Sequence, residues 1–305
     1  MRVQTSRNTQ TAAEVGTSAE YLLQVGDGRH FISPALGPDF IKVPEDTLLD
    51  SNIEEQVWHR LLHLVEIVYT DLNSGNHPDD YFADRIILTP KNTDVLAISN
   101  LMPEKVHGEM HEFTSVDSVD GDDELQRQEH GDLYPPEFLS TVSLSGMYPH
   151  KLNLKVGTPV ILIRKMSTKE GLCNGTRLRI VQLRPNCMEA AIMGGAFAGK
   201  RVIIPRIALV SKNSGFPFEL RRKPFPVQVA FVMTINKWQG QSIHRLGLYL
   251  PEPVFSHGQF YVAMSRVTSR NNIVILVDEP PTTSEGVHTK KNVYREIVAV
   301  DEAVV

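Results

Sequence analysis

Apolar residues follow helical spacing most clearly between Glu54 and Thr70, where the chain reads EEQVWHRLLHLVEIVYT. The acidic first turn favours a helix N-terminus at this point. The apolar side chains recur every three or four residues and therefore share one helix face: Val57, Leu61, Leu64, Val65 and Val68. We predict an amphipathic helix that packs this face against a core.

A short apolar run and a second helical pattern follow. The run Arg85 to Pro90 (RIILTP) predicts a buried strand, and Asn92 to Met102 carries Val95 and Ile98 at helical spacing. Strand, polar turn and helix are therefore expected to follow one another. From Ser115 to Leu139 the chain is acidic and shows no apolar periodicity, which is typical of solvated chain. We predict an acidic connector over residues 116–150 that separates two domains.

The pattern changes at Lys151 to short β-branched runs separated by turn residues. These runs predict strands at 159–163, 177–183, 188–193 and 201–210. Strands at roughly ten-residue spacing are typical of a small antiparallel barrel, which we place at residues 151–226.

Strands and helices then alternate again. Strands are predicted at 229–234, 246–250 and 273–277, with a helical turn or loop at 236–242 and a helix at 256–266. Such alternation is typical of a parallel sheet flanked by helices. The tail, residues 281–305, predicts no more than a short final helix.

Charge is distributed very unevenly along the chain. Residues 1–150 hold 9 Lys and Arg against 26 Asp and Glu, a net charge of -17. Residues 151–245 hold 17 against 3, which gives +14, and the remainder holds 5 against 7, which gives -2. The basic middle third therefore predicts contact with a polyanion.

Membrane and metal sites are not predicted. No apolar run approaches the ~20 residues of a membrane helix, and the N-terminus lacks the apolar core of a secretory signal. His59 and His63 lie one helical turn apart but have no third ligand, so we interpret them as surface histidines. Cys173 and Cys187 are isolated, which favours reduced thiols.

Two segments imitate an ATPase. Residues 194–201 (GGAFAGKR) satisfy GxxxxGK, and 273–279 (IVILVDE) resembles the acidic strand that holds magnesium. A phosphate-binding loop needs Ser or Thr after the lysine, where this chain has Arg201, and it must open a helix. The next residues are β-branched and include Pro205, so we predict a hairpin turn. We interpret Asp278 and Glu279 as the exposed end of a last strand.

Four stretches together resemble the petite-integration-frequency (PIF) family of superfamily 1 DNA helicases, including the versions carried by Helitron transposons. They are RIILTPKN at 85–92, VGTPVILIRKMSTKEGLCNGTRL at 156–178, MTINKWQGQS at 233–242 and VFSHGQFYVAMSRV at 254–267. The resemblance implies an α/β fold in which a RecA-like parallel-sheet domain, 2A, is interrupted by a small antiparallel β-barrel, 2B, of the Src-homology-3 type. Domain 2A would comprise residues 1–115 and 227–280, the latter carrying helicase motifs V and VI, and 2B residues 151–226.

The resemblance also implies a function. The chain would be the carboxyl-terminal motor half of an ATP-dependent 5′-to-3′ DNA helicase that binds single-stranded DNA. ATP and Mg²⁺ would be bound mainly by an amino-terminal RecA-like motor domain, whose phosphate-binding loop this sequence lacks, so the chain alone is expected to be inactive. A nuclear location is expected, with mitochondrial or cytoplasmic as alternatives. The alternative function is a non-catalytic nucleic-acid-binding fragment or a mobile-element relic.

By resemblance, nucleotide chemistry falls on motifs V and VI. Arg266, near the end of the predicted helix, would be the arginine finger that stabilises charge on the γ-phosphate. The alternative is a cation that satisfies the last carbonyls of its own helix. Gln239, Gly240 and Gln259 would lie toward the nucleotide, and Arg2 would be a second cationic contact to ATP.

DNA contacts are expected where strands of the parallel sheet end. Thr234, Asn236 and Lys237 can meet phosphates after one strand, and Trp238 either stacks on a base or fills the core. Thr89 and Asn92 are either turn and helix-cap residues or phosphate contacts at a helix N-terminus. In the predicted barrel the candidate phosphate contacts are Arg164 and Arg177.

Overall fold

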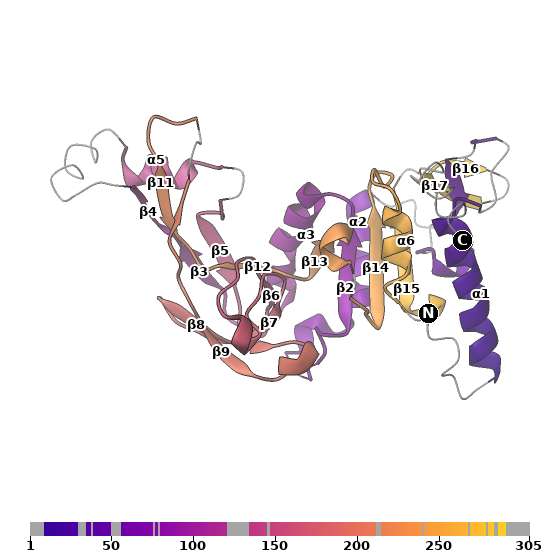
Figure 1. Ribbon diagram of the computed structural model, residues 1–305, viewed down its shortest axis with the longest axis horizontal. Helices are drawn as coiled ribbons and strands as arrows, with labels where there is room; N and C mark the ends of the chain where they lie inside the picture. The colour runs from indigo at the N-terminus through magenta and orange to yellow at the C-terminus, as the bar shows by residue number, and fades with distance from the viewer. Residues whose placement is uncertain are drawn as a thin grey trace, which may run out of the picture. The chain divides into compact units, whose positions relative to one another are not determined.

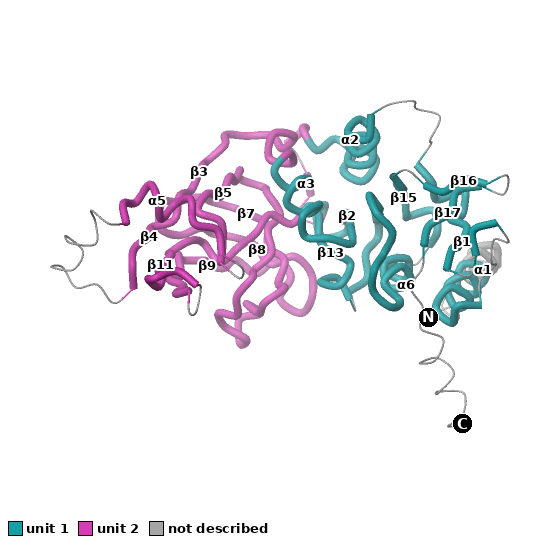
Figure 2. The backbone as a smooth tube through the Cα atoms, turned by 90° about the horizontal axis from the view of Figure 1, so that it is seen from above, with its two compact units in different colours: residues 1–72, 81–100, 231–305 teal, residues 73–80, 101–230 magenta. Residues whose placement is uncertain are grey.

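The computed structural model divides the 305-residue chain into two compact units (Figure 2). Unit 1 comprises residues 1–72, 81–100 and 231–305, and unit 2 comprises residues 73–80 and 101–230. The structure describes residues 9–29, 35–37, 39–49, 56–75, 77–78, 80–120, 134–144, 147–211, 215–239, 241–267, 269–278, 280–283 and 286–290, with side chains described from residue 16.

Unit 1 is built on a four-stranded parallel sheet. Its strand order is β13 (Val232–Thr234), β2 (Arg85–Thr89), β14 (Arg245–Leu250) and β15 (Ile273–Val277). The strands are continuous apolar runs because both faces of such a sheet are covered. The predicted α/β fold with a RecA-like parallel sheet is therefore confirmed.

Helices flank this sheet (Figure 1). Helix α2 (Val57–Val68) lies within the predicted 54–70 segment and packs Leu61, Leu64, Val65 and Val68 toward β14 and β15. Helix α3 (Asn92–Lys105) follows β2, as predicted. Helix α6 (Gln259–Met264) is shorter than the predicted 256–266, and α1 (Thr9–Gly26), which the sequence analysis did not predict, packs against it.

Close packing of α2 on β14 depends on Gly247. A Cβ atom at this position would lie 2.8 Å from Val68 Cγ2 and 3.1 Å from Ile87 Cγ1. Only a residue without a side chain therefore permits this approach of helix to strand.

The end of the chain differs from its prediction. Strands β16 (Thr282–Thr283) and β17 (Gly286–Lys290) form an antiparallel sheet with β1 (Phe40–Lys42), so β15 is not the last strand. Asp278 is not the exposed end of a strand either, because its carboxylate is mostly buried and pairs with Arg60 at 2.7 Å. The possible final helix lies outside the described residues, and short polar strands that pair far along the chain leave no local pattern.

Unit 2 contains the predicted small antiparallel β domain. Its five-stranded sheet has the order β12 (Val227–Val229), β6 (Pro159–Leu162), β7 (Arg177–Leu183), β8 (Cys187–Ile192) and β9 (Arg201–Pro205). The GGAFAGK segment joins β8 to β9 through one 3-10 turn, Gly195–Phe197, and a strand follows it. The hairpin interpretation of the phosphate-loop imitation is confirmed.

The predicted acidic connector is wrong for the residues that the structure describes. Strands β4 (Val116–Val119), β11 (Leu220–Lys223) and β10 (Leu209–Val210) form a sheet, and β3 (His111–Thr114) pairs with β5 (Lys151–Leu154). Helix α5 (Pro136–Thr141) places Leu139 in a buried cluster with Phe218 and Leu220. The partners of β4 and α5 lie far along the chain, so composition alone suggested solvated chain.

The predicted strand 229–234 is two strands. Val227–Val229 pairs with β6 in unit 2, whereas Val232–Thr234 pairs with β2 in unit 1, and the chain passes between the units at Ala230 and Phe231. Unit 2 also starts earlier than the predicted domain limit, at Leu101 for its main segment. No helix among the described residues has the length and apolar content to cross a membrane.

Candidate functional site

Two candidate residues end neighbouring strands of the parallel sheet. Thr89 on β2 and Thr234 on β13 are register partners, and both side chains are buried. The Thr89 hydroxyl donates to Asp94 Oδ2 at 3.1 Å, which ties the strand end to the first turn of α3. Burial of Thr89 favours its alternative as a turn residue, and burial of Thr234 disfavours the direct phosphate contact expected there.

Polar residues become exposed immediately beyond these strand ends. Asn92 is the first residue of α3, and Asn236 and Lys237 lie in the 3-10 helix Ile235–Trp238 (η6) that follows β13. The exposed Gln239 ends that helix, whereas Gly240 lies outside the described residues. The structure therefore brings exposed donors from two elements to the carboxyl edge of the sheet, where α/β proteins bind ligands.

Trp238 anchors this edge. Its side chain is 2 % exposed, and Ile235 in the same short helix is fully buried. Helix η6 packs against α6, so the indole fills the core and offers no stacking face to a base. Of the two alternatives for Trp238, the structure supports the core.

Gln259 begins α6 and organises the loop before it. The side-chain oxygen accepts hydrogen bonds from the backbone N–H groups of Phe255 and Ser256, at 3.2 and 3.3 Å. The residue is 1 % exposed, and its amide nitrogen has no hydrogen-bond partner among the described residues. A buried donor without a partner is costly, so this nitrogen marks a position where an acceptor would be stabilised.

Arg266 follows α6 and uses all three guanidinium nitrogens. Nε donates to the carbonyl of Val262 at 2.7 Å, Nη2 to the hydroxyl of Ser265 at 2.6 Å, and Nη1 to the carbonyl of Gln241 at 3.3 Å. Partial burial lowers the pKa of this guanidinium, which nevertheless stays charged. Arg266 therefore caps its own helix and at the same time holds the loop that follows η6.

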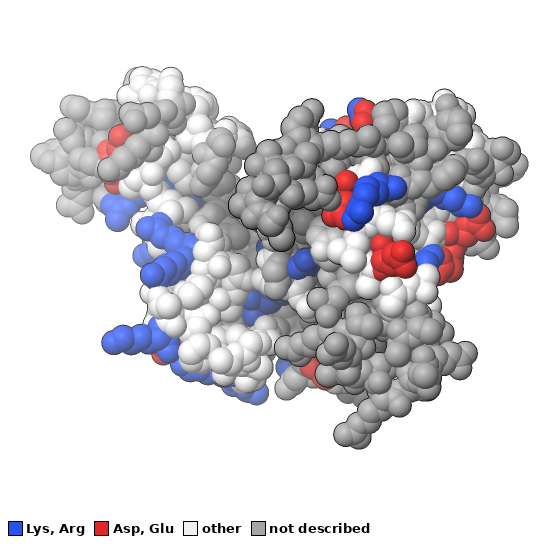
Figure 3. All heavy atoms as spheres, turned by 45° about the vertical axis from the view of Figure 1, so that its right-hand side comes forward, with Lys and Arg blue, Asp and Glu red and all other residues white. Residues whose placement is uncertain are grey.

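Basic residues of unit 2 were the remaining candidates. Figure 3 shows Lys and Arg outnumbering Asp and Glu on the visible face of unit 2. Arg164 is exposed, as a phosphate contact requires. Arg177 is only 6 % exposed, so its guanidinium has little surface for a phosphate. Arg2 lies outside the described residues.

A buried polar network in unit 2 escaped the sequence analysis. Asp117 lies in the acidic segment that was expected to be solvated, yet it forms a two-oxygen ion pair with Arg222, and their side chains are 3 % and 2 % exposed. Arg222 also donates to the carbonyls of Tyr148 and Leu139. Ser115 Oγ donates to Asp117 at 2.6 Å, and His150 Nδ1 lies 2.9 Å from the same carboxylate.

This network controls the ionisation of Asp117. Burial is the largest influence and opposes ionisation, but hydrogen bonds from Arg222, Ser115 and His150 together outweigh it and hold the pKa of Asp117 below its ordinary value. The burial alternation along LRRK, in which Leu220 and Arg222 point inward, is the sequence feature that could have indicated a buried arginine.

Ser265 and Gln241 were also missed as partners of Arg266. Both lie inside quoted motifs, but a motif does not show which of its members hydrogen bond to one another. Among the described residues no group of three His, Cys, Asp or Glu side chains is placed to hold a metal ion.

Comparison with known sequences points to one group of proteins. The family model described as "DNA helicase Pif1, 2B domain" matches residues 137–183. Human ATP-dependent DNA helicase PIF1 is 27 % identical over 187 residues, which is 61 % of this chain and 26 % of that protein. PIF6 of Trypanosoma brucei brucei is 26 % identical over 132 residues, 42 % of this chain and 17 % of the relative. These matches thus span about a quarter or less of the relatives' own length.

Solved structures share the fold. A structure described as the basis for unwinding of forked DNA by two coordinating Pif1 helicases has a TM-score of 0.56 and 17 % identity, over 94 % of this chain and 51 % of that one. Pif1 helicase from Bacteroides in complex with ADP-AlF3 and single-stranded DNA gives a TM-score of 0.56 and 15 % identity, over 99 % and 55 % of the two chains. At these identities the likeness concerns the fold, and the chain spans about half of each structure.

Proposed function

Because this chain belongs to the Pif1 family of DNA helicases, we propose that it supplies the second motor half of an ATP-driven enzyme that moves along single-stranded DNA. In this proposal a first motor domain with a phosphate-binding loop binds most of the ATP. Movement in the 5′-to-3′ direction is part of the proposal by family resemblance.

The observation that carries the proposal is the link between α6 and the segment formed by η6 and the residues after it up to Ile243, which we call the η6 loop. Arg266 donates to the carbonyl of Gln241, and the N–H of Ile243 donates to the carbonyl of Arg266 at 2.9 Å. The loop carries the exposed Asn236 and Lys237, which suit DNA phosphates. A short stretch of chain and these two hydrogen bonds therefore connect the proposed DNA contacts to Arg266, the candidate arginine finger.

Arg266 would serve ATP by exchanging its present partners. A guanidinium beside a γ-phosphate stabilises charge that grows in the transition state, worth roughly 10³ to 10⁵ in rate in well-studied hydrolases. Its bonds to Gln241 and Ser265 are to neutral acceptors, so a phosphate can replace them with stronger charged hydrogen bonds. In this resting arrangement the finger is held by its own helix until the nucleotide arrives.

The described residues fit part of a nucleotide site. Of these, Gln239 and Arg266 would face the phosphates, and Gln259 would hold the loop before α6. Gly240 and Arg2, which lie outside the described residues, are further contacts in this proposal by family resemblance. ATP bound there would supply a phosphoanhydride bond for hydrolysis, with Mg²⁺ held by the first motor domain. We propose phosphate contact for Asn92, Lys237 and Arg164, and at most a supporting role for the buried Thr89, Thr234 and Arg177.

The test joins this chain to the first motor domain of a Pif1 helicase and measures ATPase activity with saturating single-stranded DNA. The fusion is expected to gain DNA-stimulated turnover that the separate chain lacks. As a matched control, Lys200→Ala should leave turnover unchanged, because Lys200 lies on the β8–β9 hairpin, 3.7 Å from Glu170. Turnover by the separate chain that disappears with Lys200→Ala would contradict the proposal.

A second candidate function is a nucleic-acid-binding fragment or mobile-element relic without catalysis. One observation favours it: every guanidinium nitrogen of Arg266 already has an acceptor within this chain. A fusion that binds DNA but shows no ATPase activity would support this second function.

A further inference from the structure

Unit 2 has a concave surface outside the motifs discussed so far, which we call the Arg206 pocket. Its volume is about 400 Å³, which is within the usual range for small-molecule pockets. Its walls are formed by strand β3, by the turn after β7 and by the residue that follows β9. The lining residues are His111, Glu112, Phe113, Thr114, Leu183, Arg184, Pro185 and Arg206.

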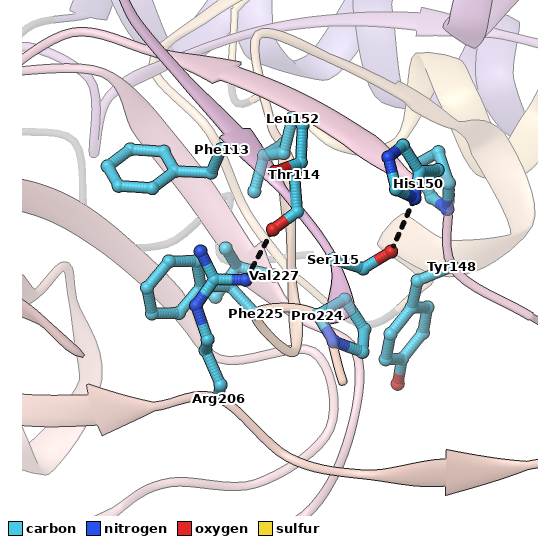
Figure 4. A pocket seen from close by; sticks show the side chains of 11 residues that line it. Phe113, Thr114, Ser115, Tyr148, His150, Leu152, Arg206, Pro224, Phe225 and Val227 are labelled. Carbon is cyan, nitrogen blue, oxygen red and sulfur yellow. Dashed lines mark hydrogen bonds between the residues drawn. The ribbon is translucent and has the colours of Figure 1, made fainter. Parts of the chain in front are cut away.

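One wall of the pocket is aromatic. The rings of His111 and Phe113 are stacked, with centroids 6.4 Å apart and planes 26° apart. Phe113 meets Phe225 edge to face, with ring centroids 5.3 Å apart, and this contact restrains the Phe113 ring. Figure 4 shows Phe113 and Phe225 beside Arg206. The two half-buried rings, with nearly parallel planes, lie on one strand and form a platform on which a flat, aromatic ligand can stack.

A second part of the lining is cationic. Arg206 lies over the Phe225 ring, 4.6 Å from its centroid, and donates to the carbonyls of Pro185 at 2.9 Å and Thr114 at 2.6 Å. These contacts fix the guanidinium while Nη2 has no partner among the described residues. Arg184 is exposed, and the one acceptor of its guanidinium among the described residues is the side-chain oxygen of Gln182, at 3.0 Å.

Charge in the pocket favours an anionic ligand. Neither Arg184 nor Arg206 forms an ion pair with any described residue, so both positive charges remain uncompensated. The one acidic lining residue, Glu112, pairs with Lys151 at 3.2 Å. A neighbouring crevice, which shares Phe113, Thr114 and Arg206 with the pocket, has room for about one water (10 Å³), so a ligand would not enter it.

We propose that the Arg206 pocket binds one nucleotide of single-stranded DNA, with the base on the His111–Phe113 platform and the phosphate between Arg184 and Arg206. A small inorganic anion would leave the aromatic wall unused, and an apolar ligand would leave two cations without a partner. A nucleotide satisfies both walls. The inference rests on the proposed function only in naming DNA as the polymer, and it adds a contact away from the η6 loop.

The test measures binding of the full chain to fluorescent oligo-dT and to an abasic oligonucleotide of equal length, by anisotropy at low salt. His111→Ala should weaken oligo-dT binding roughly fivefold or more, because fivefold corresponds to the lower end of the free energy of stacking one base on an aromatic ring. Binding to the abasic oligonucleotide should be unchanged. Arg184→Ala should weaken binding to oligo-dT and to the abasic oligonucleotide alike. Arg201→Ala is the matched control, because this exposed arginine lies at the other end of β9 and should change either affinity less than twofold.

The outcomes separate this inference from the proposed function. If Lys237→Ala weakens binding while His111→Ala and Arg184→Ala do not, the pocket is not a nucleotide site and the proposed function stands. If only the pocket variants weaken binding, the pocket is supported and the η6 contacts are wrong. An equal loss with His111→Ala on abasic DNA would overturn the stacking role. Wild-type chain that binds oligo-rU but not oligo-dT would overturn the choice of DNA.

Discussion

Arg266 and Gln241 are joined by a hydrogen bond of 3.3 Å from the guanidinium of the first to the carbonyl oxygen of the second. The bond connects two of the quoted motifs, because Arg266 lies in the segment 254–267 and Gln241 in the segment 233–242. In the proposed function, Arg266 would respond both to the nucleotide and to the loop that is proposed to contact DNA.

Arg266 should therefore control turnover more than DNA affinity. In the fusion with a first motor domain, Arg266→Ala should lower the DNA-stimulated ATPase rate by about 10³ or more, since the lost guanidinium acts in the transition state. Binding of single-stranded DNA should change less than about threefold. Arg266→Lys should not rescue turnover, because an ammonium cannot reproduce the planar fork.

The control for this variant is folding. Because Arg266 also caps α6, circular dichroism and limited proteolysis must show that the helix is retained. Ser265→Ala provides the matched change, since it removes one partner of the guanidinium and keeps the charge. Full turnover by Arg266→Ala would leave Arg266 as a structural cap only.

Lys237 should behave in the opposite way. Its side chain is exposed in η6, and losing one phosphate contact should weaken single-stranded DNA binding and reduce the slope of log affinity against log salt by about 0.7. The ATPase rate at saturating DNA should be nearly retained. Titrations at several salt concentrations measure the slope, and an unchanged slope would show that Lys237 does not contact phosphate.

Gly247 should tolerate no side chain. In Gly247→Ala the new Cβ would meet Val68 at 2.8 Å and Leu64 at 3.3 Å, so α2 must shift away from β14 at a cost of about 1–3 kcal/mol in the free energy of unfolding. Gly16→Ala is the control, because nothing lies within 4 Å of its added Cβ and a helix prefers alanine. Urea unfolding compares the two, and equal stabilities would mean that α2 relaxes without cost.

The sequence predicted those elements whose pattern is local. Helix α2 carries apolar residues at helical spacing and strand β2 is a short continuous apolar run, so the local pattern was sufficient to predict both. Asp117 was misinterpreted because its neighbours are acidic and its partner, Arg222, lies 105 residues away. Strand β1 pairs with β17 across an even longer separation, which no local pattern records.

In the candidate site, too, the features that depend on distant partners could not be predicted from the local sequence. The motif residues Asn236 and Lys237 were expected to be exposed and are. Thr89 and Thr234 lie in equally good motifs, yet both point into the protein where β2 and β13 pair. Exposure at a strand end depends on the neighbouring strand and helix, which a motif does not include.

The Asp117–Arg222 pair should make unit 2 sensitive to acid. The pKa of Asp117 is lower in the folded chain than its ordinary value of 3.8, so the ionised carboxylate stabilises the fold. That contribution is complete well above pH 3.8 and is lost as the pH falls through 3.8 toward the lower folded pKa. Unfolding of unit 2 is therefore expected to become easier below about pH 4.

Arg222→Met should change both the size and the sign of this effect. At pH 7 it leaves a buried carboxylate without its cation, which costs about 3–5 kcal/mol. Burial then dominates and raises the pKa of Asp117, so mild acid should stabilise this variant relative to pH 7. Arg221→Met is the matched control, since its side chain is half exposed on the same strand and should cost less than about 0.5 kcal/mol.

The measurement must report on unit 2 separately. Both tryptophans, Trp58 and Trp238, belong to unit 1, so tryptophan fluorescence follows that unit. Hydrogen exchange at β4 and β11 follows unit 2, because these strands carry the two partners. We expect Arg222→Met to increase exchange at β4 and β11 at pH 7 while the fluorescence transition stays in place. Unchanged exchange in that variant would mean that Arg222 contributes little to holding β4 against β11, and the buried pair would then not stabilise the unit.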